Sequence, residues 1–129
     1  MFAPVGTRKR VLVVDDELAA RVLAEGLLRK LGHEVISCAQ ATDAASLAEK
    51  HRPDLVLLDV LMPGLDGAGV ARALAARPGT ASIPVVFLTS IISSREEGKR
   101  DQKGSRFLAK PVDRNKLAAV LYQVFGTAA

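Results

Sequence analysis

The sequence predicts a three-layer α/β/α domain, in which a parallel sheet of five strands lies between two layers of helices. Short, continuous apolar runs alternate along the chain with longer segments that repeat apolar residues at helical spacing. A continuous apolar run is typical of a strand that is buried on both faces of a parallel sheet. Because parallel strands need right-handed crossover connections, the intervening helices must cover the faces of the sheet.

The first strand and the first helix are expected in residues 11–14 and 18–31. The strand is the run Val-Leu-Val-Val, and the helix is followed by Gly32, a residue type that commonly ends helices. The apolar residues of the helix recur three or four positions apart, which places them on the face that meets the sheet. They are Ala20, Leu23, Ala24, Leu27, Leu28 and Leu31.

The second and third strands are expected in residues 34–38 and 55–58, and the second is the weaker of the two. Between them, Thr42 is expected to cap a helix that runs to about Lys50, because a Thr hydroxyl can accept a hydrogen bond from a free helical N–H. Three small residues would form the face of this helix against the sheet: Ala41, Ala45 and Ala48. Cys38 is interpreted as a small residue of the second strand.

The second half of the chain is expected to supply two more strands, residues 83–88 and 107–109. Asp66 and Asp113 are placed to cap the third helix and the last helix. The apolar faces are Val70, Ala71, Leu74 and Ala75 in the third helix, and Leu117, Val120, Leu121, Val124 and Phe125 in the last. Residues 93–105 should hold the fourth helix, but they lack an apolar stripe and contain Gly98. This helix is therefore expected to be short or irregular.

Composition and charge exclude several classes of protein. The 129 residues, of which 49% are hydrophobic and 25% charged, fit one globular domain. No apolar run approaches the roughly 18 residues of a membrane span. The N-terminus lacks the apolar stretch of a signal peptide, and a single cysteine excludes an intramolecular disulfide, so a cytoplasmic location is expected. The net charge of +4 is scattered and accompanies no nucleic-acid-binding motif, so direct binding of nucleic acid is not expected.

Polar residues follow four of the predicted strands at the point where each strand ends. They are Asp15 and Asp16 after the first strand, Asp59 after the third, Thr89 after the fourth and Lys110 after the fifth. The carboxyl ends of parallel strands lie at one edge of a sheet, where ligands bind, so these side chains are expected to converge. Three carboxylates, a hydroxyl and an ammonium suit a divalent cation and a phosphoryl group. An ionised carboxylate can also act as a nucleophile without a general base.

These residues, in this order, resemble those of a receiver domain, the phosphorylatable module of bacterial two-component response regulators. The resemblance covers about residues 10–125 and depends on four motifs in combination. They are the strand that ends in Asp15-Asp16-Glu17, the segment from Asp59 through Met62-Pro63-Gly64 to Asp66-Gly67, the pair Leu88-Thr89, and the pair Lys110-Pro111. The resemblance implies an N-terminal extension of residues 1–9 and a receiver domain of residues 10–126.

The resemblance also implies a fold and a metal site. The fold would be flavodoxin-like and doubly wound, with the five strands in the order 2-1-3-4-5. Asp59 would be the phosphoacceptor. Asp15, Asp16, Asp59 and the backbone carbonyl of Leu61 would hold Mg²⁺ or Mn²⁺.

Three further residues have roles that the resemblance implies. Thr89 would be a switch hydroxyl, and Lys110 would contact the phosphoryl group, with a cis bond between Lys110 and Pro111. Phe107 matches an aromatic switch position, although an ordinary packing residue of the fifth strand stays open as an alternative. Ser90 departs from the Ala or Gly that is common after Thr89, which leaves the lifetime of the phosphoryl group open.

The expected function is a signalling switch, which receives a phosphoryl group on Asp59 from a histidine kinase or a phosphotransfer protein and then changes its binding to a partner or effector domain. It would catalyse only its own phosphotransfer and dephosphorylation. One alternative is a receiver-like scaffold that binds partners without phosphorylation. Another is a phosphohydrolase, but Leu61 stands where such enzymes usually need a second acid. The sequence specifies neither the kinase, the output, the oligomeric state, nor whether the chain is a stand-alone protein.

Other residues that could bind ligands have simpler interpretations. The glycines Gly64, Gly67 and Gly69 match neither a dinucleotide fingerprint nor a phosphate-binding loop, so they are expected to serve turns and helix packing. His33 and His51 follow helix ends and have no Cys or His partner at metal-ligand spacing. Both histidines are expected to be structural residues of the surface.

Overall fold

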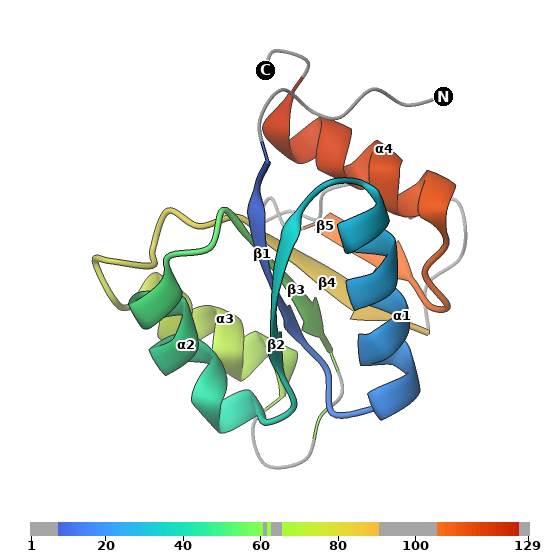
Figure 1. Ribbon diagram of the computed structural model, residues 1–129. Coiled ribbons are helices and arrows are strands. Elements are labelled where there is room, and N and C mark those ends of the chain that lie inside the picture. The colour runs from blue at the N-terminus through green and yellow to red at the C-terminus, as the bar shows by residue number, and fades with distance from the viewer. Residues whose placement is uncertain (1–7, 61, 63–65, 91–105, 127–129) are drawn as a thin grey trace.

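The computed structural model contains a five-stranded parallel sheet between two layers of helices, with the strands in the order 2-1-3-4-5 (Figure 1). It describes residues 8–60, 62, 66–90 and 106–126. From residue 10 to residue 89 strands and helices alternate along the chain, as the apolar runs predict, and each pair of neighbouring strands is parallel. The expected fold class and strand order are confirmed. The expected irregular fourth helix falls within residues 91–105, outside the described part of the chain.

The strands are the continuous apolar runs of the sequence. They are β1 Arg10–Val14, β2 Glu34–Cys38, β3 Leu55–Asp59, β4 Val85–Thr89 and β5 Arg106–Ala109. The two central strands, β1 and β3, are buried along almost their whole length, which explains why polar residues do not interrupt them. Their register pairs Val14 with Leu58, and β3 pairs Asp59 with Leu88 of β4. The strands therefore end level with one another at one edge of the sheet.

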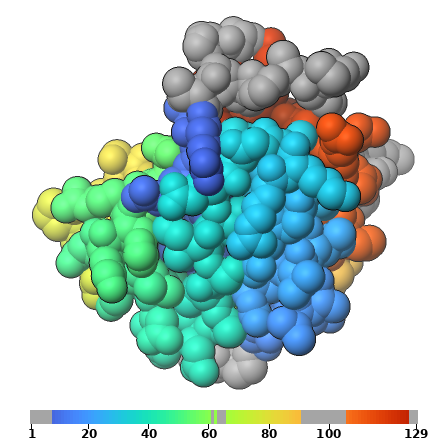
Figure 2. Space-filling view, in the orientation of Figure 1, coloured from blue at the N-terminus to red at the C-terminus, as the bar shows by residue number. Residues whose placement is uncertain are grey.

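Among the described residues, helices cover both faces of the sheet (Figure 1). The helices are α1 Leu18–Lys30, α2 Ala44–His51, α3 Gly67–Ala75 and α4 Arg114–Phe125. Along β1, Val11 and Val13 pack with residues of α1 and α4, whereas Leu12 and Val14 pack with residues of α2 and α3. Figure 2 shows the segment from α1 through β2 to α2, coloured blue to green, covering one side of the molecule. No helix of the described residues is long and apolar enough to cross a membrane.

The predicted ends of three helices are confirmed. Gly32, which follows α1, has a φ of +92°, a conformation that favours glycine. Asp66 Oδ1 accepts a hydrogen bond from the backbone N–H of Gly69 at 2.8 Å, and Asp113 Oδ1 accepts one from Lys116 at 2.8 Å. Caps of this kind typically stabilise a helix by about 1 kcal/mol each.

Three expectations about the helices are wrong. Thr42 does not cap α2, because a 3₁₀ turn over Ala41–Asp43 precedes the helix and buries Ala41 against the sheet. The α-helix therefore begins at Ala44. Leu23 remains 40% exposed, and Ala75 is exposed while Ala73 packs against the core instead. Leu23 and Ala75 therefore lie at the margins of their apolar stripes, where the helix surface turns toward the solvent.

The expected surface position of His33 is also wrong. This residue is buried, with only 4% of it exposed. His33 lies in the short connection between α1 and β2. Its Nδ1 accepts a hydrogen bond from the backbone N–H of Lys9 at 3.1 Å. The ammonium of Lys9 lies 5.1 Å from the centre of the Phe125 ring. His33 is therefore a structural residue, as expected, but a buried one. Its hydrogen bond with Lys9 connects the segment before β1 to the segment that follows α1. The other histidine, His51, is half-buried.

Acidification is expected to destabilise the protein through His33. Burial, helped by the charges of Lys9 and Arg8 and opposed by Asp54, lowers the pKa of His33 from its usual 6.5. The unfolded chain therefore binds a proton on this residue more readily than the folded chain does. Stability should fall as the pH drops through about 6.5 and continues toward the lowered pKa.

Urea unfolding at several pH values, from neutral to about one unit below 6.5, would measure this effect. This pH range lies above the one in which most carboxylates titrate. His33→Gln should flatten the dependence on pH, and it should cost about 1 kcal/mol at neutral pH if the hydrogen bond from Lys9 is weakened. The control His51→Gln lies outside this contact and should keep the wild-type slope. An unchanged slope in His33→Gln would contradict the assignment.

Candidate functional site

Three carboxylates meet at the edge of the sheet where β1 and β3 end. Asp15, Asp16 and Asp59 each offer an oxygen atom, and these atoms lie within 4.8 Å of one another. Asp15 and Asp59 are buried, with 1% and 6% exposed, whereas Asp16 is exposed. A hard divalent cation prefers such carboxylate oxygens, and one exposed ligand leaves an entry path from the solvent. The three residues therefore fit a magnesium-type ion.

The backbone around this cluster is firmly held. The N–H of Asp15 donates to the carbonyl oxygen of Cys38 in β2 at 3.0 Å, and Asp15 Oδ1 accepts from the N–H of Glu17 at 3.0 Å. Beyond Asp59, the N–H of Val60 donates to the carbonyl oxygen of Leu88 at 3.0 Å. These bonds continue the sheet past its last formal residues, so the carboxylates project from a rigid edge.

Lys110 lies among the carboxylates. Its Nζ is 2.8 Å from Asp15 Oδ2, 3.4 Å from Asp59 Oδ1 and 3.7 Å from Glu17 Oε1. Its backbone N–H donates to the carbonyl oxygen of Thr89 at 2.9 Å, and the bond to Pro111 is cis, as expected. Burial alone would lower the pKa of Lys110, but the hydrogen bond and charge of Asp15, with those of Asp59, raise it overall. Lys110 therefore stays cationic and offsets the charge of the two buried carboxylates.

A cavity of about 470 Å³ opens onto this cluster. Its lining consists of Asp16, Glu17, Asp59, Thr89, Ser90 and Lys110. Thr89 ends β4 and is buried, so the end of the strand fixes its backbone. Carboxylates, hydroxyls and an ammonium thus surround one space of a size that admits a small anion together with a metal ion. Of the five side chains predicted from the sequence for this site, four line the cavity, and the fifth, Asp15, pairs with Lys110 beside it.

Comparison with known proteins identifies the family. A family model described as the response regulator receiver domain matches residues 11–122. The chain belongs to the response regulator receiver domain family. Receiver domains are regulatory domains of two-component systems, and the family binds Mg²⁺ in an acidic pocket of the kind that Asp15, Asp16 and Asp59 form here.

Individual relatives agree with this assignment. The receiver domain is 34% identical to the protein PilH of Pseudomonas aeruginosa over 116 residues, which are 89% of this chain and 96% of PilH. It is 35% identical to the gliding motility regulatory protein of Myxococcus xanthus over 87% of this chain, but this covers only 16% of that longer protein. Receiver domains related to this chain therefore occur both as nearly whole proteins and as parts of larger ones.

Solved structures share the fold. The chemotaxis protein CheY4 of Vibrio cholerae is similar with a TM-score of 0.80 and 28% identity, over 92% of this chain and 99% of CheY4. The receiver domain of the sensor histidine kinase PA1611 from Pseudomonas aeruginosa is similar with a TM-score of 0.79 and 31% identity, over 93% of this chain and 99% of that one. That structure has a magnesium ion coordinated in its active site cleft.

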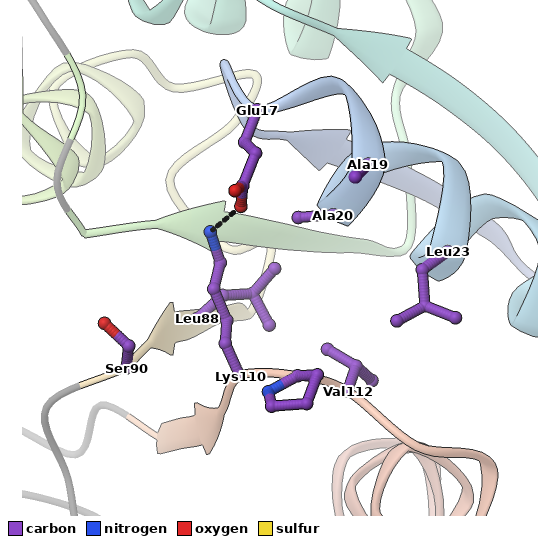
Figure 3. Close-up of a pocket in the computed structure, with 9 residues that line it drawn as sticks. Glu17, Ala19, Ala20, Leu23, Leu88, Ser90, Lys110 and Val112 are labelled. Carbon is purple, nitrogen blue, oxygen red and sulfur yellow. Dashed lines mark ion pairs between the residues drawn. The ribbon is translucent and has the colours of Figure 1, made fainter.

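Glu17 contributes to the site of this receiver domain, although it is not among the site residues predicted from the sequence. Figure 3 shows its carboxylate pointing at the ammonium of Lys110. Its position directly after Asp15 and Asp16 was the one feature of the sequence that pointed to the site. Sequence position alone does not show that a side chain next to the start of α1 reaches the lysine that follows β5. Glu17 is 64% exposed at its side chain, so its pairing with Lys110 is the weakest of the three.

A second pocket, of about 460 Å³, lies beside the first, between the start of α1 and the turn that follows β5 (Figure 3). Its lining is largely aliphatic and consists of Glu17, Ala19, Ala20, Leu23, Leu88, Ser90, Lys110, Pro111 and Val112. On the neighbouring surface of α1, Leu18 and Val22 are 64% and 54% exposed. This receiver domain therefore presents apolar surface next to its acidic site, and Leu23 is part of that surface.

The expected roles of Phe107 and Leu61 in the receiver domain stay predictions. Phe107 is half-buried and stacks on Phe87 of β4, with ring centroids 5.4 Å apart and an angle of 26° between the ring planes. This contact accounts for its packing, and its role as a switch stays a prediction. The carbonyl of Leu61, expected as a metal ligand, lies outside the described residues.

Proposed function

We propose that this receiver domain is a phosphorylation-dependent switch in which Asp59 accepts a phosphoryl group from the phosphohistidine of a histidine kinase or a phosphotransfer protein. The observation that supports the proposal most strongly is the position of the Asp59 carboxylate. It lies at the end of β3 within reach of two other carboxylates and 3.4 Å from the Lys110 ammonium, at an open cavity. The switch would operate in the cytoplasm, and residues 10–126 would form it.

The proposed reaction is a displacement at phosphorus. An oxygen of the ionised Asp59 carboxylate forms a bond to phosphorus, and the bond from phosphorus to the donor imidazole nitrogen breaks, with its electron pair passing to that nitrogen. Repulsion between the carboxylate and the phosphoryl oxygens opposes this approach. Mg²⁺ or Mn²⁺, held by Asp15, Asp16, Asp59 and the carbonyl of Leu61, would supply the positive charge that offsets the repulsion.

Lys110 and Thr89 are proposed to bind the phosphoryl oxygens. Lys110 is cationic and needs only to turn from Asp15 toward the new group, which favours a charge-assisted hydrogen bond. The Thr89 hydroxyl would donate to another oxygen, and movement of Thr89 toward the group would release space for Phe107. Hydrolysis of the acyl phosphate would return the domain to its resting state. Ser90, which lines the same cavity, would influence how fast water attacks.

The phosphorylated form is proposed to change its affinity for a downstream protein or effector domain. A donor protein would approach across the apolar surface beside the site, where Leu18, Val22 and Leu23 are exposed next to the Lys110 pocket. A scaffold that binds partners without phosphorylation would not need three clustered carboxylates and a lysine, so the geometry favours the switch. The switch is not expected to bind nucleic acid directly.

Dependence on the metal tests the proposal. The protein is incubated with a small acyl phosphate as phosphodonor and analysed by intact-mass spectrometry, with Mg²⁺ or with excess EDTA. We expect a gain of one phosphoryl group with Mg²⁺ and none with EDTA, because the three carboxylates alone repel the donor. Equal uptake under both conditions would contradict the proposed metal site. If beryllofluoride, a phosphoryl analogue, left the NMR signals of Thr89 unchanged, the switch itself would be contradicted.

A further inference from the structure

One side chain of α1 is bound directly to the backbone of the acidic cluster. Nη1 of Arg21 donates a hydrogen bond to the carbonyl oxygen of Asp15 at 2.8 Å. This oxygen belongs to the peptide group that joins Asp15 to Asp16. The guanidinium is largely sheltered, since only 16% of the Arg21 side chain is exposed. A short hydrogen bond from a sheltered, rigid guanidinium is a strong restraint on the orientation of that peptide group.

The guanidinium is itself held from its other side. Nε of Arg21 lies 3.9 Å from Oε2 of Glu25, and the same carboxylate accepts a hydrogen bond from the hydroxyl of Ser37 in β2. Helix α1 and strand β2 lie side by side in Figure 2, which brings these residues together. The charge of Glu25 also compensates that of Arg21. Arg21 is therefore a fixed donor whose charge Glu25 offsets in part.

This contact matters because Asp16 depends on its backbone for its position. Asp15 is held by its own N–H, by its side chain and by Lys110. Asp16 is exposed, and none of the described residues donates a hydrogen bond to its carboxylate. The peptide group before Asp16 thus sets where this carboxylate lies relative to Asp15 and Asp59. Arg21 fixes the oxygen atom of that peptide group.

We propose that Arg21 is a positioning residue for the metal site, which holds the peptide group between Asp15 and Asp16 so that all three carboxylates face one ion. The inference rests on the proposed magnesium site. It predicts that loss of Arg21 weakens metal binding. A simple electrostatic effect has the opposite sign, because removal of a cation near the site would strengthen the binding of Mg²⁺.

The experiment is a calorimetric titration of the metal-free protein with Mg²⁺, without phosphodonor, on the wild type, Arg21→Met and Arg29→Met. Arg29 also pairs with Glu25, at 3.7 Å, but its side chain is 60% exposed and belongs to the far end of α1. Removal of groups that hold metal ligands typically costs about 10–100-fold in affinity. We expect Arg21→Met to weaken Mg²⁺ binding by about tenfold, at the low end of that range, and Arg29→Met to leave it unchanged or slightly stronger.

Arg21→Lys keeps the charge and one donor but loses the rigid guanidinium, so its affinity should lie between those of the wild type and Arg21→Met. In the metal-free protein, the amide NMR signal of Asp16 should shift in Arg21→Met and stay in place in Arg29→Met. If the wild type binds Mg²⁺ and both Arg21 variants bind it equally well or more tightly, the inference is overturned and the proposed function stands. If the wild type itself binds no Mg²⁺, the proposed function fails.

Discussion

Replacement of Asp59 by Asn is expected to abolish phosphoryl uptake completely. The amide oxygen of Asn is neutral and a poor nucleophile, so no acyl phosphate can form at this position. The change also removes one of the three clustered carboxylates and the Asp59 partner of Lys110 at 3.4 Å. Because Asn has almost the same shape as Asp, the fold should persist. Intact-mass spectrometry after incubation with an acyl phosphate and Mg²⁺ measures the result.

The matched control is Asp43→Asn, which makes the same chemical change at an exposed carboxylate in the turn before α2. This variant should gain one phosphoryl group at the wild-type rate. Thermal unfolding of both variants would verify that each is folded. A phosphoryl gain that survives in Asp59→Asn would show that another residue accepts the group, and the proposed mechanism would have to be abandoned.

The second large effect is expected from Gly67→Ala. A Cβ atom on Gly67, the first residue of α3, would lie 2.7 Å from the carbonyl oxygen of Asp59 and 2.9 Å from Cα of Val60. Both are backbone atoms, so they cannot turn away as the end of a side chain can. The N-terminus of α3 would have to move, which would strain the 2.9 Å hydrogen bond from the N–H of Gly67 to the carbonyl oxygen of Val60. We expect a loss of about 1–3 kcal/mol in the free energy of unfolding.

Gly67→Ala should also weaken Mg²⁺ binding, because the clash acts on the backbone of Asp59. The control is Gly26→Ala in the middle of α1, where a Cβ atom would meet nothing within 4 Å. Alanine has the higher helix propensity, so this variant should be more stable by about 0.5–1 kcal/mol. Urea unfolding of the two variants would give opposite signs. A Gly67→Ala protein as stable as the wild type would mean that the close approach of α3 to β3 is not a constraint.

The sequence predicted the sheet well because burial on both faces leaves a plain signal, a continuous apolar run, at β1, β3 and β4. The convergence of Asp15, Asp59 and Lys110 followed from one rule, that parallel strands end at one edge. The margins of helices were harder to predict. Leu23 recurs at helical spacing but lines a pocket beside the site instead of the core, since spacing gives the direction of a side chain and not what lies opposite it.

Contacts between distant residues could not be predicted in the same way. His33 was expected on the surface because it follows a helix end, yet it is buried and accepts a hydrogen bond from the backbone N–H of Lys9. Arg21 belongs to none of the motifs found in the sequence and is one of its scattered cations. Its role depends on a 2.8 Å contact with a backbone oxygen, which no pattern of residue types reveals. Such features arise from the packing of whole elements, and the sequence specifies them only through the complete fold.

The most direct test of the central claim is to identify the residue that carries the phosphoryl group. The wild-type protein is phosphorylated with an acyl phosphate and Mg²⁺, then treated with borohydride, which reduces an aspartyl phosphate to homoserine, and its peptides are analysed by mass spectrometry. Homoserine is expected at position 59 and at no other aspartate. Homoserine at position 15 or 16, or a phosphorylated protein with an unmodified Asp59, would contradict the proposed role of Asp59.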